Sequence, residues 1–174
     1  MLRWGCARVF SPTPVNLMLL LIFTAVVVHT TALPNGAALT PPRGITTWEI
    51  FNFAVSAAEL EALAEGAVST GLAAAGYSII WLDDGWPLCA KFSGAPGTSA
   101  CATPAPRAAN GSVVVDDAKF PQGMAAVVAS IHARGLQVGI YTAPHAVTCG
   151  GYTASLNYEA VDAATFVAWG IDAV

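Results

Sequence analysis

The apolar positions of this 174-residue sequence follow a pattern that repeats three times. Each time, apolar residues at helical spacing lead to a glycine, and a short apolar run follows at once. The three junctions are Ala75-Gly76-Tyr77, Arg134-Gly135-Leu136 and Trp169-Gly170-Ile171. Short runs rich in β-branched and aromatic residues are typical of strands covered on both faces, and strands that alternate with helices build parallel sheets. The pattern therefore predicts an α/β fold of consecutive parallel β/α units.

The apolar runs predict four strands, of which the last is present only at its start. They cover residues 44–48, 77–82, 136–141 and 171–174. The spacing between strands is near that of a β/α unit, except where one long loop intervenes. Three units and the start of a fourth amount to about half of a (β/α)8 TIM barrel. We therefore interpret residues 43–174 as the amino-terminal half of such a barrel, truncated before it closes.

Three helices are predicted between these strands. The first begins at Ser56, which forms a capping box with Glu59. The second begins at Pro121, and Asn157 caps the third. Their stripes at helical spacing are Leu60, Leu63, Ala64, Ala67 and Val68; Met124, Val127, Val128 and Ile131; and Tyr158, Val161, Thr165 and Trp169. Each stripe is expected to face the sheet.

A long loop, residues 87–119, separates the second strand from the second helix. It is rich in glycine and proline, and we expect no regular structure in it, which marks it as functional or disordered. Cys89 and Cys101 bracket part of the loop and are predicted to form a local disulfide. Asp116 and Asp117 near its end are interpreted as a solvated turn.

The first 32 residues have the order of a secretory signal peptide. Arg3 and Arg8 precede an uncharged apolar run, residues 17–28, which is shorter than the ~20 residues of a membrane span. We predict cleavage after Ala32 and a linker over 33–42, with an uncleaved signal anchor as the alternative. Cleavage would leave no membrane span and a protein of the secretory pathway, either extracellular or lysosomal/vacuolar. The sequon at Asn110 is a predicted glycosylation site in that setting.

Charge and cysteine usage exclude other classes of partner. Lys and Arg number 7 against 11 Asp and Glu, a net charge of −4, so we expect no nucleic-acid surface. His29, His132 and His145 are scattered, and no Cys/His spacing resembles a zinc site, so we predict neither a metal nor a cofactor. Once Cys89 and Cys101 are paired, Cys149 needs a partner in another molecule or in sequence that is absent here.

Candidate chemistry follows the second strand. Asp83 and Asp84 end its apolar run, and Trp86 comes soon after. The carboxyl ends of parallel strands are where ligands bind, and carboxylates with an indole suit a sugar. An ordinary turn is the alternative for these residues alone. Two neighbouring carboxylates suit the grip on hydroxyls better than they suit the flanking of a scissile bond. Trp48 and Tyr141, at the ends of neighbouring strands, are predicted pocket walls.

Several segments resemble, in the same order, glycoside hydrolase family 27, the melibiase group of α-galactosidases and α-N-acetylgalactosaminidases. They are Leu39–Gly44, Trp48–Phe51, Gly71–Tyr77, Leu82–Trp86, Lys119–Met124, His132–Tyr141, Thr148-Cys149 and Asp162–Asp172. The resemblance covers residues 39–174. It implies a (β/α)8 barrel followed by a β-sandwich, and hydrolysis of terminal α-galactosides with retention. It is also compatible with a homodimer of the full-length protein.

The same resemblance implies roles for individual residues. Trp48 would form an aromatic wall, Asp83 and Asp84 would accept hydrogen bonds from galactose hydroxyls, and Tyr141 would line the pocket. The family's two catalytic aspartates are expected beyond Val174, so this chain alone is expected to be inactive. An α-N-acetylgalactosaminidase and a non-catalytic sugar-binding remnant remain the alternatives.

The chain departs from the family pattern around this pocket. Gly85 stands where the family usually has a cysteine bonded to another after the first strand, and Phe53 and Ala54 stand near that partner's place. Residues 44–48 lack the second tryptophan that is common in the family, and residues 141–145 replace the usual Ser-Asp-x-Gly after the tyrosine. The resemblance also implies that Cys149 pairs with a cysteine that follows the nucleophile.

Overall fold

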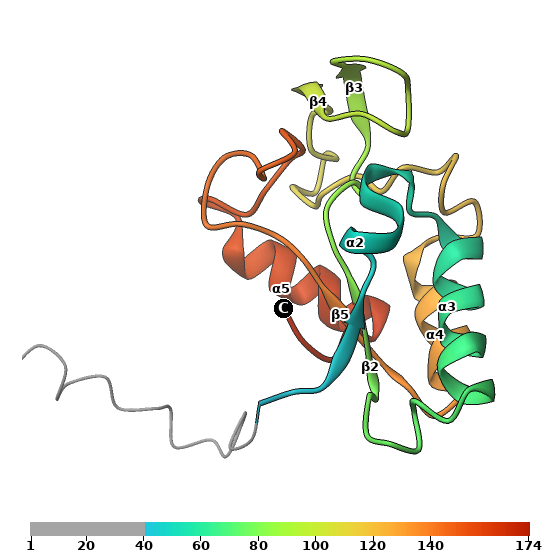
Figure 1. The fold of residues 1–174 in the computed structure, drawn as a ribbon. Helices are drawn as coiled ribbons and strands as arrows, with labels where there is room; N and C mark the ends of the chain where they lie inside the picture. The colour runs from blue at the N-terminus through green and yellow to red at the C-terminus, as the bar shows by residue number, and fades with distance from the viewer. Residues whose placement is uncertain (1–40) are drawn as a thin grey trace, which may run out of the picture. The chain divides into compact units, whose positions relative to one another are not determined.

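A computed structural model of the protein describes residues 41–174. Its centre is a parallel sheet of three strands in the order β1 (Gly44–Thr46), β2 (Ile79–Leu82) and β5 (Gln137–Ile140) (Figure 1). Ala173 forms a parallel bridge with Gly139, so the chain after the last helix runs beside β5. The predicted α/β class with a parallel sheet is confirmed. The predicted signal peptide, 1–32, and most of the predicted linker lie outside the described residues.

The register of the sheet explains its glycines. Thr46 is paired with Trp81, and Trp81 with Gly139. Successive side chains of a strand point to opposite faces, so Ile80 and Leu82, both fully buried in the core, lie on the face opposite Trp81. The Trp81 indole lies between Gly44 and Gly139, and a Cβ at either glycine would collide with it. The two glycines therefore make room for a large side chain on a small sheet.

Three helices contribute to one core with the strands: α3 (Ala57–Ser69), α4 (Met124–His132) and α5 (Glu159–Trp169). Helices α3 and α4 pack side by side (Figure 1). All four residues predicted to face inward from the second helix are buried, although α4 begins at Met124 and not at Pro121. In α3, Leu60, Ala64 and Ala67 are buried, whereas the prediction for Val68 is wrong because its side chain is 44% exposed.

Two predicted helix starts need correction. No side-chain cap to the backbone forms at Ser56, since its hydroxyl bonds to the Glu59 carboxylate itself. Asn157 is not the cap of α5: it has a φ of 66°, and Tyr158 occupies the N-cap position. The buried face of α5 is also shifted from the predicted stripe.

The buried residues of that helix are Asp162 and Phe166, while Tyr158 is 42% exposed. The stripe was misplaced because a buried aspartate interrupts the apolar pattern. An ion pair described below accounts for that burial.

The first two strands are shorter than predicted. Strand β1 ends at Thr46, and Trp48 begins the short helix α2 (Trp48–Phe51), which a 3-10 turn, η1 (Asn52–Ala54), follows. The Phe51 N–H donates to the Thr47 carbonyl, which turns the chain away from the sheet. Tyr77 lies before β2 and is 40% exposed.

The segment 87–119 is more regular than predicted. It contains an antiparallel hairpin of β3 (Cys89–Phe92) and β4 (Cys101–Pro104), which extends beyond the carboxyl end of β2 (Figure 1). The predicted disulfide between Cys89 and Cys101 is confirmed and joins the two strands. The predicted turn is present and Asp117 is exposed, but Asp116 is buried and not solvated: its N–H donates to the Trp86 carbonyl, and its carboxylate accepts the Ala118 N–H. Within residues 41–174, no helix has the length and apolar character needed to cross a membrane.

Candidate sugar-binding site

The loops after β1, β2 and β5 are bonded to one another at the carboxyl ends of the strands. The Thr47 N–H donates to the Trp81 carbonyl at 3.0 Å, and the Thr47 hydroxyl accepts the Asp83 N–H at 3.0 Å. On the other side, the Tyr141 N–H donates to the Leu82 carbonyl at 2.8 Å. The parallel sheet thus brings the segments that carry Trp48, the two aspartates and Tyr141 to one edge.

The Asp83 carboxylate has unused hydrogen-bond acceptor positions. It is half-buried, and its Oδ1 accepts the Asp84 N–H at 2.7 Å. Its Oδ2 has only a long contact, 3.5 Å, with the Thr46 hydroxyl. An ionised carboxylate offers about four acceptor positions, so most of those on Asp83 are open to a ligand. Asp83 can therefore form an ordinary turn and still bind a ligand.

Asp84 differs from its neighbour because it is 2% exposed. Its Oδ1 accepts the Gly85 N–H and its Oδ2 accepts the Gly150 N–H, each at 2.8 Å. Burial raises the pKa of Asp84, while the hydrogen bonds from the Thr148 side chain and the two N–H groups counteract that shift. Asp84 is thus a tie between the loops after β2 and β5, with little capacity left for a ligand. The sequence did not indicate this tie.

The aromatic residues divide into a wall and a core. Trp48 is half-buried and packs edge-to-face on Phe53, with the ring centroids 5.0 Å apart. Trp86, which the sequence placed beside the sugar, is 1% exposed: its Nε1–H donates to the Tyr141 carbonyl at 2.9 Å, and its ring packs on Phe166. Trp86 therefore belongs to the core, whereas Trp48 remains available as a wall.

Tyr141 and Cys149 lie together at the end of β5. Burial raises the pKa of the Tyr141 hydroxyl, and the neighbouring Cys149 side chain acts in the same direction. The Cys149 thiol is exposed and free within the described part of the chain. Tyr141 is only half-buried, so its ring can contact a ligand at this edge.

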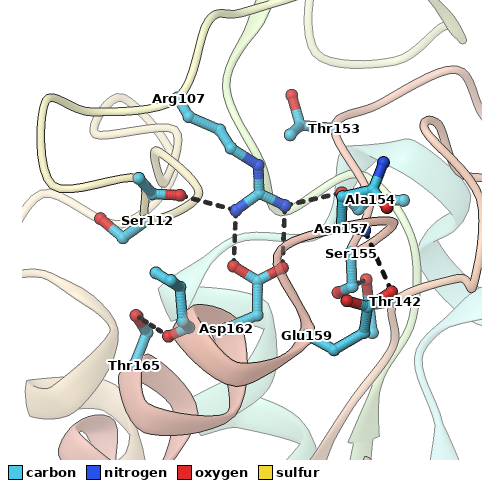
Figure 2. Close-up of polar contacts among 12 residues, drawn as sticks. Arg107, Ser112, Thr142, Thr153, Ala154, Ser155, Asn157, Glu159, Asp162 and Thr165 are labelled. Carbon is cyan, nitrogen blue, oxygen red and sulfur yellow. Dashed lines mark hydrogen bonds and ion pairs between the residues drawn. The ribbon is translucent and has the colours of Figure 1, made fainter.

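An ion pair that the sequence did not reveal lies at helix α5. Arg107 donates through Nη1 and Nη2 to the two carboxylate oxygens of Asp162, at 2.6 and 2.8 Å (Figure 2). The same guanidinium donates to the carbonyls of Gly111 and Ala154 and lies over the Tyr158 ring, 4.0 Å from its centroid. The side chain of Asp162 is 2% exposed. One arginine therefore fastens the segment that follows β4, the loop after β5, and helix α5.

A hollow of about 440 Å³ lies next to this cluster, between the loop after β5 and α5. Its lining includes Thr142, Ser155, Glu159 and Phe166. None of the four residues predicted to contact sugar lines this hollow. Within residues 41–174, no three His, Cys, Asp or Glu side chains are grouped so that they could hold a metal ion.

Comparison with known proteins agrees with this geometry. The family Melibiase_2, described as Alpha galactosidase A, matches residues 40–174, and the chain belongs to this family. The alpha-galactosidase of Lachancea cidri is 40% identical over 138 residues, which cover 79% of this chain and 26% of that protein.

Two solved structures show the same arrangement. Alpha-galactosidase I from Mortierella vinacea matches with a TM-score of 0.70 at 34% identity, over 80% of this chain and 31% of that one. The α-galactosidase from Saccharomyces cerevisiae, solved with raffinose, matches with a TM-score of 0.68 at 33% identity, over 79% and 27%. The chain therefore spans between a quarter and a third of the length of these relatives.

Proposed function

We propose that the protein to which this chain belongs is a retaining α-galactosidase, which hydrolyses terminal α-D-galactosyl residues of oligosaccharides or glycoconjugates. One observation carries the proposal: in a chain of this family, an acceptor-rich Asp83 follows β2 while an aromatic side chain follows each neighbouring strand. The names of the relatives support galactose as the sugar, and raffinose, present in the yeast structure, ends in an α-galactosyl group.

We assign the grip on the sugar to four residues. The free oxygen positions of Asp83 accept hydrogen bonds from ring hydroxyls, and the Trp48 indole packs on the apolar C–H face of the ring. Tyr141 closes the pocket from the side of β5. Asp84 accepts three hydrogen bonds within the protein, which leaves about one of its acceptor positions for a second hydroxyl.

Bond cleavage is assigned to residues outside this chain. Retaining glycosidases place two carboxyl groups about 5–5.5 Å apart, on opposite sides of the anomeric carbon. Asp83 and Asp84 are neighbours on one loop, and Asp84 is held by backbone N–H groups, so they do not suit these roles. We therefore propose that the nucleophile and the acid/base follow Val174, and that the sheet is the first part of a (β/α)8 barrel.

The secretory pathway is the proposed location. The Cys89–Cys101 disulfide supports it, because disulfides persist in oxidising compartments. Asn110 is exposed, as a glycosylation acceptor must be. We propose a glycan there and, for Cys149, a disulfide partner outside the chain. Sequencing the amino terminus of the secreted protein tests cleavage after Ala32, and enzymatic removal of N-glycans tests Asn110.

The function is tested by incubating the protein with a p-nitrophenyl α-galactoside and with the matching α-N-acetylgalactosaminide. We expect release from the galactoside, with α-galactose as the first product seen by NMR. Faster hydrolysis of the N-acetylgalactosaminide would contradict the galactoside specificity and identify an α-N-acetylgalactosaminidase instead. Galactose binding measured by calorimetry without any hydrolysis would leave only the sugar-binding role.

A further inference from the structure

The loops after β1 and β2 come into close contact at Phe53 and Gly85. A Cβ built on Gly85 would lie 3.0 Å from the Phe53 Cα. This chain has no cysteine at Gly85 or at Phe53, so no disulfide joins the two loops at this contact. The two loops carry Trp48 on one side and the acidic pair on the other, so their separation sets the shape of the site.

Lys119 joins these two loops. Its Nζ donates to the Phe53 carbonyl at 2.6 Å and to the Gly85 carbonyl at 2.8 Å. Both distances suit charge-assisted hydrogen bonds, which are roughly twice as strong as those between neutral groups. One ammonium group therefore bridges the loop after β1 and the loop after β2.

The backbone of Lys119 is itself held in place. Its N–H donates to the Asp116 carbonyl at 3.1 Å, and its carbonyl accepts the Ala57 N–H at 3.0 Å, next to the start of α3. The side chain is half-buried. Burial lowers the pKa of Lys119, and the negative charges of Asp116 and Asp84 oppose that shift. The backbone of Lys119 is thus held by hydrogen bonds, and its ammonium has two carbonyl acceptors and two carboxylates nearby that offset its charge. An ordinary surface lysine lacks these contacts.

We propose that Lys119 is a positioning residue, whose ammonium fixes the aromatic wall at Trp48 relative to the acidic pair by tying Phe53 to Gly85. The consequence for sugar affinity rests on the proposed function, whereas the tie between the loops is measurable without sugar.

The test compares three variants in the whole protein. Lys119→Met removes the charge and keeps the stem, Lys119→Arg restores a cationic donor, and Lys91→Met removes an exposed lysine on β3 as the control. Hydrogen–deuterium exchange is followed in peptides covering 49–55 and 83–87, with 57–69 as a reference, and galactose affinity is measured by calorimetry.

We expect Lys119→Met to speed amide exchange in the first two peptides and to raise the galactose Kd about tenfold, since a hydrogen bond to a charged group is worth about that factor or more. Lys119→Arg should recover most of both effects, and Lys91→Met should cause neither. If Lys119→Met does not fold, Lys119→Gln, which keeps a donor, replaces it.

Unchanged exchange in both peptides would overturn the tie. Faster amide exchange in 49–55 and 83–87 with an unchanged galactose Kd would overturn the positioning role. An equal increase in exchange across the reference peptide 57–69 would also overturn it. A wild-type protein that binds no galactose would contradict the proposed function, while the exchange result would still decide whether the tie exists.

Discussion

The Oδ2 atom of Asp84 accepts a hydrogen bond from the backbone N–H of Gly150 at 2.8 Å. This bond joins the loop after β2 to the loop after β5, across 66 residues of sequence. It also places a glycine against a ring, because a Cβ at Gly150 would collide with Phe53 and lie 2.7 Å from the same Asp84 oxygen. The carboxylate, the glycine and the ring are therefore interdependent.

Replacement of Gly150 by alanine should disrupt this arrangement. The added methyl group has no space, so Phe53 or the Asp84 carboxylate must move. We expect a loss of about 1–3 kcal/mol in the free energy of unfolding, measured with urea, as is usual for overpacking. Galactose affinity should fall with it.

Gly66→Ala is the matched control for that substitution. Gly66 lies inside α3, and a Cβ there meets no heavy atom within 4 Å. Alanine should raise stability by up to about 1 kcal/mol, because it favours a helix over the unfolded chain more than glycine does. Equal effects of the two substitutions would show that Gly150 is not sterically required.

Removal of the Asp162 carboxylate should be strongly destabilising. Asp162→Ala leaves the Arg107 guanidinium, whose side chain is 10% exposed, without its charge partner. Breaking a buried pair on one side costs about 3–5 kcal/mol. Arg134→Ala is the control, because its pair with Glu65 is exposed and such pairs contribute at most about 1 kcal/mol. Urea unfolding of both variants measures the difference, and a loss below 1 kcal/mol for Asp162→Ala would contradict the assignment.

Tyr152 should make stability depend on alkaline pH. Burial raises its pKa to about 12 from an ordinary value of 10.0, with the charges of Asp84 and Asp116 acting in the same direction. Between those two values the unfolded chain has lost the phenolic proton and the folded chain retains it, so the contribution to stability is present below pH 10 and decreases up to about pH 12.

Tyr152→Phe removes the titrating group and keeps the ring. The variant should lose only the hydrogen bond from the hydroxyl to the Ser99 carbonyl at lower pH. Its thermal stability should therefore fall less steeply than that of the wild type above pH 10. Parallel pH profiles in calorimetric melting would contradict the assignment to Tyr152.

The sequence predicted the parts of the fold that depend on local apolar pattern. The strand before Asp83, the buried face of α4 and the Cys89–Cys101 pair are all present. It misplaced the buried face of α5, because the burial of Asp162 depends on Arg107, 55 residues away. It also missed the hairpin in 87–119, whose strands are too short to give a clear alternation.

In the site, sequence reasoning assigned the same role to Asp83 and Asp84, whereas their surroundings in the structure differ. The buried Asp84 carboxylate accepts the backbone N–H groups of Gly85 and Gly150. The N–H of Gly150 comes near Asp84 only when the chain folds. The role of Lys119 was missed for the same reason, since its acceptors at Phe53 and Gly85 are backbone carbonyls without a sequence signature.

Galactose affinity of Asp83→Asn in the whole protein, measured by calorimetry beside Asp117→Asn, tests the assigned site most directly. Asp117 is an exposed carboxylate in the loop before α4, so its substitution controls for the loss of one charge. We expect Asp83→Asn to raise the Kd at least about tenfold with an unchanged melting temperature, because a charge-assisted acceptor is lost. Wild-type affinity and turnover in Asp83→Asn would contradict the assignment of Asp83 as the residue that holds the sugar.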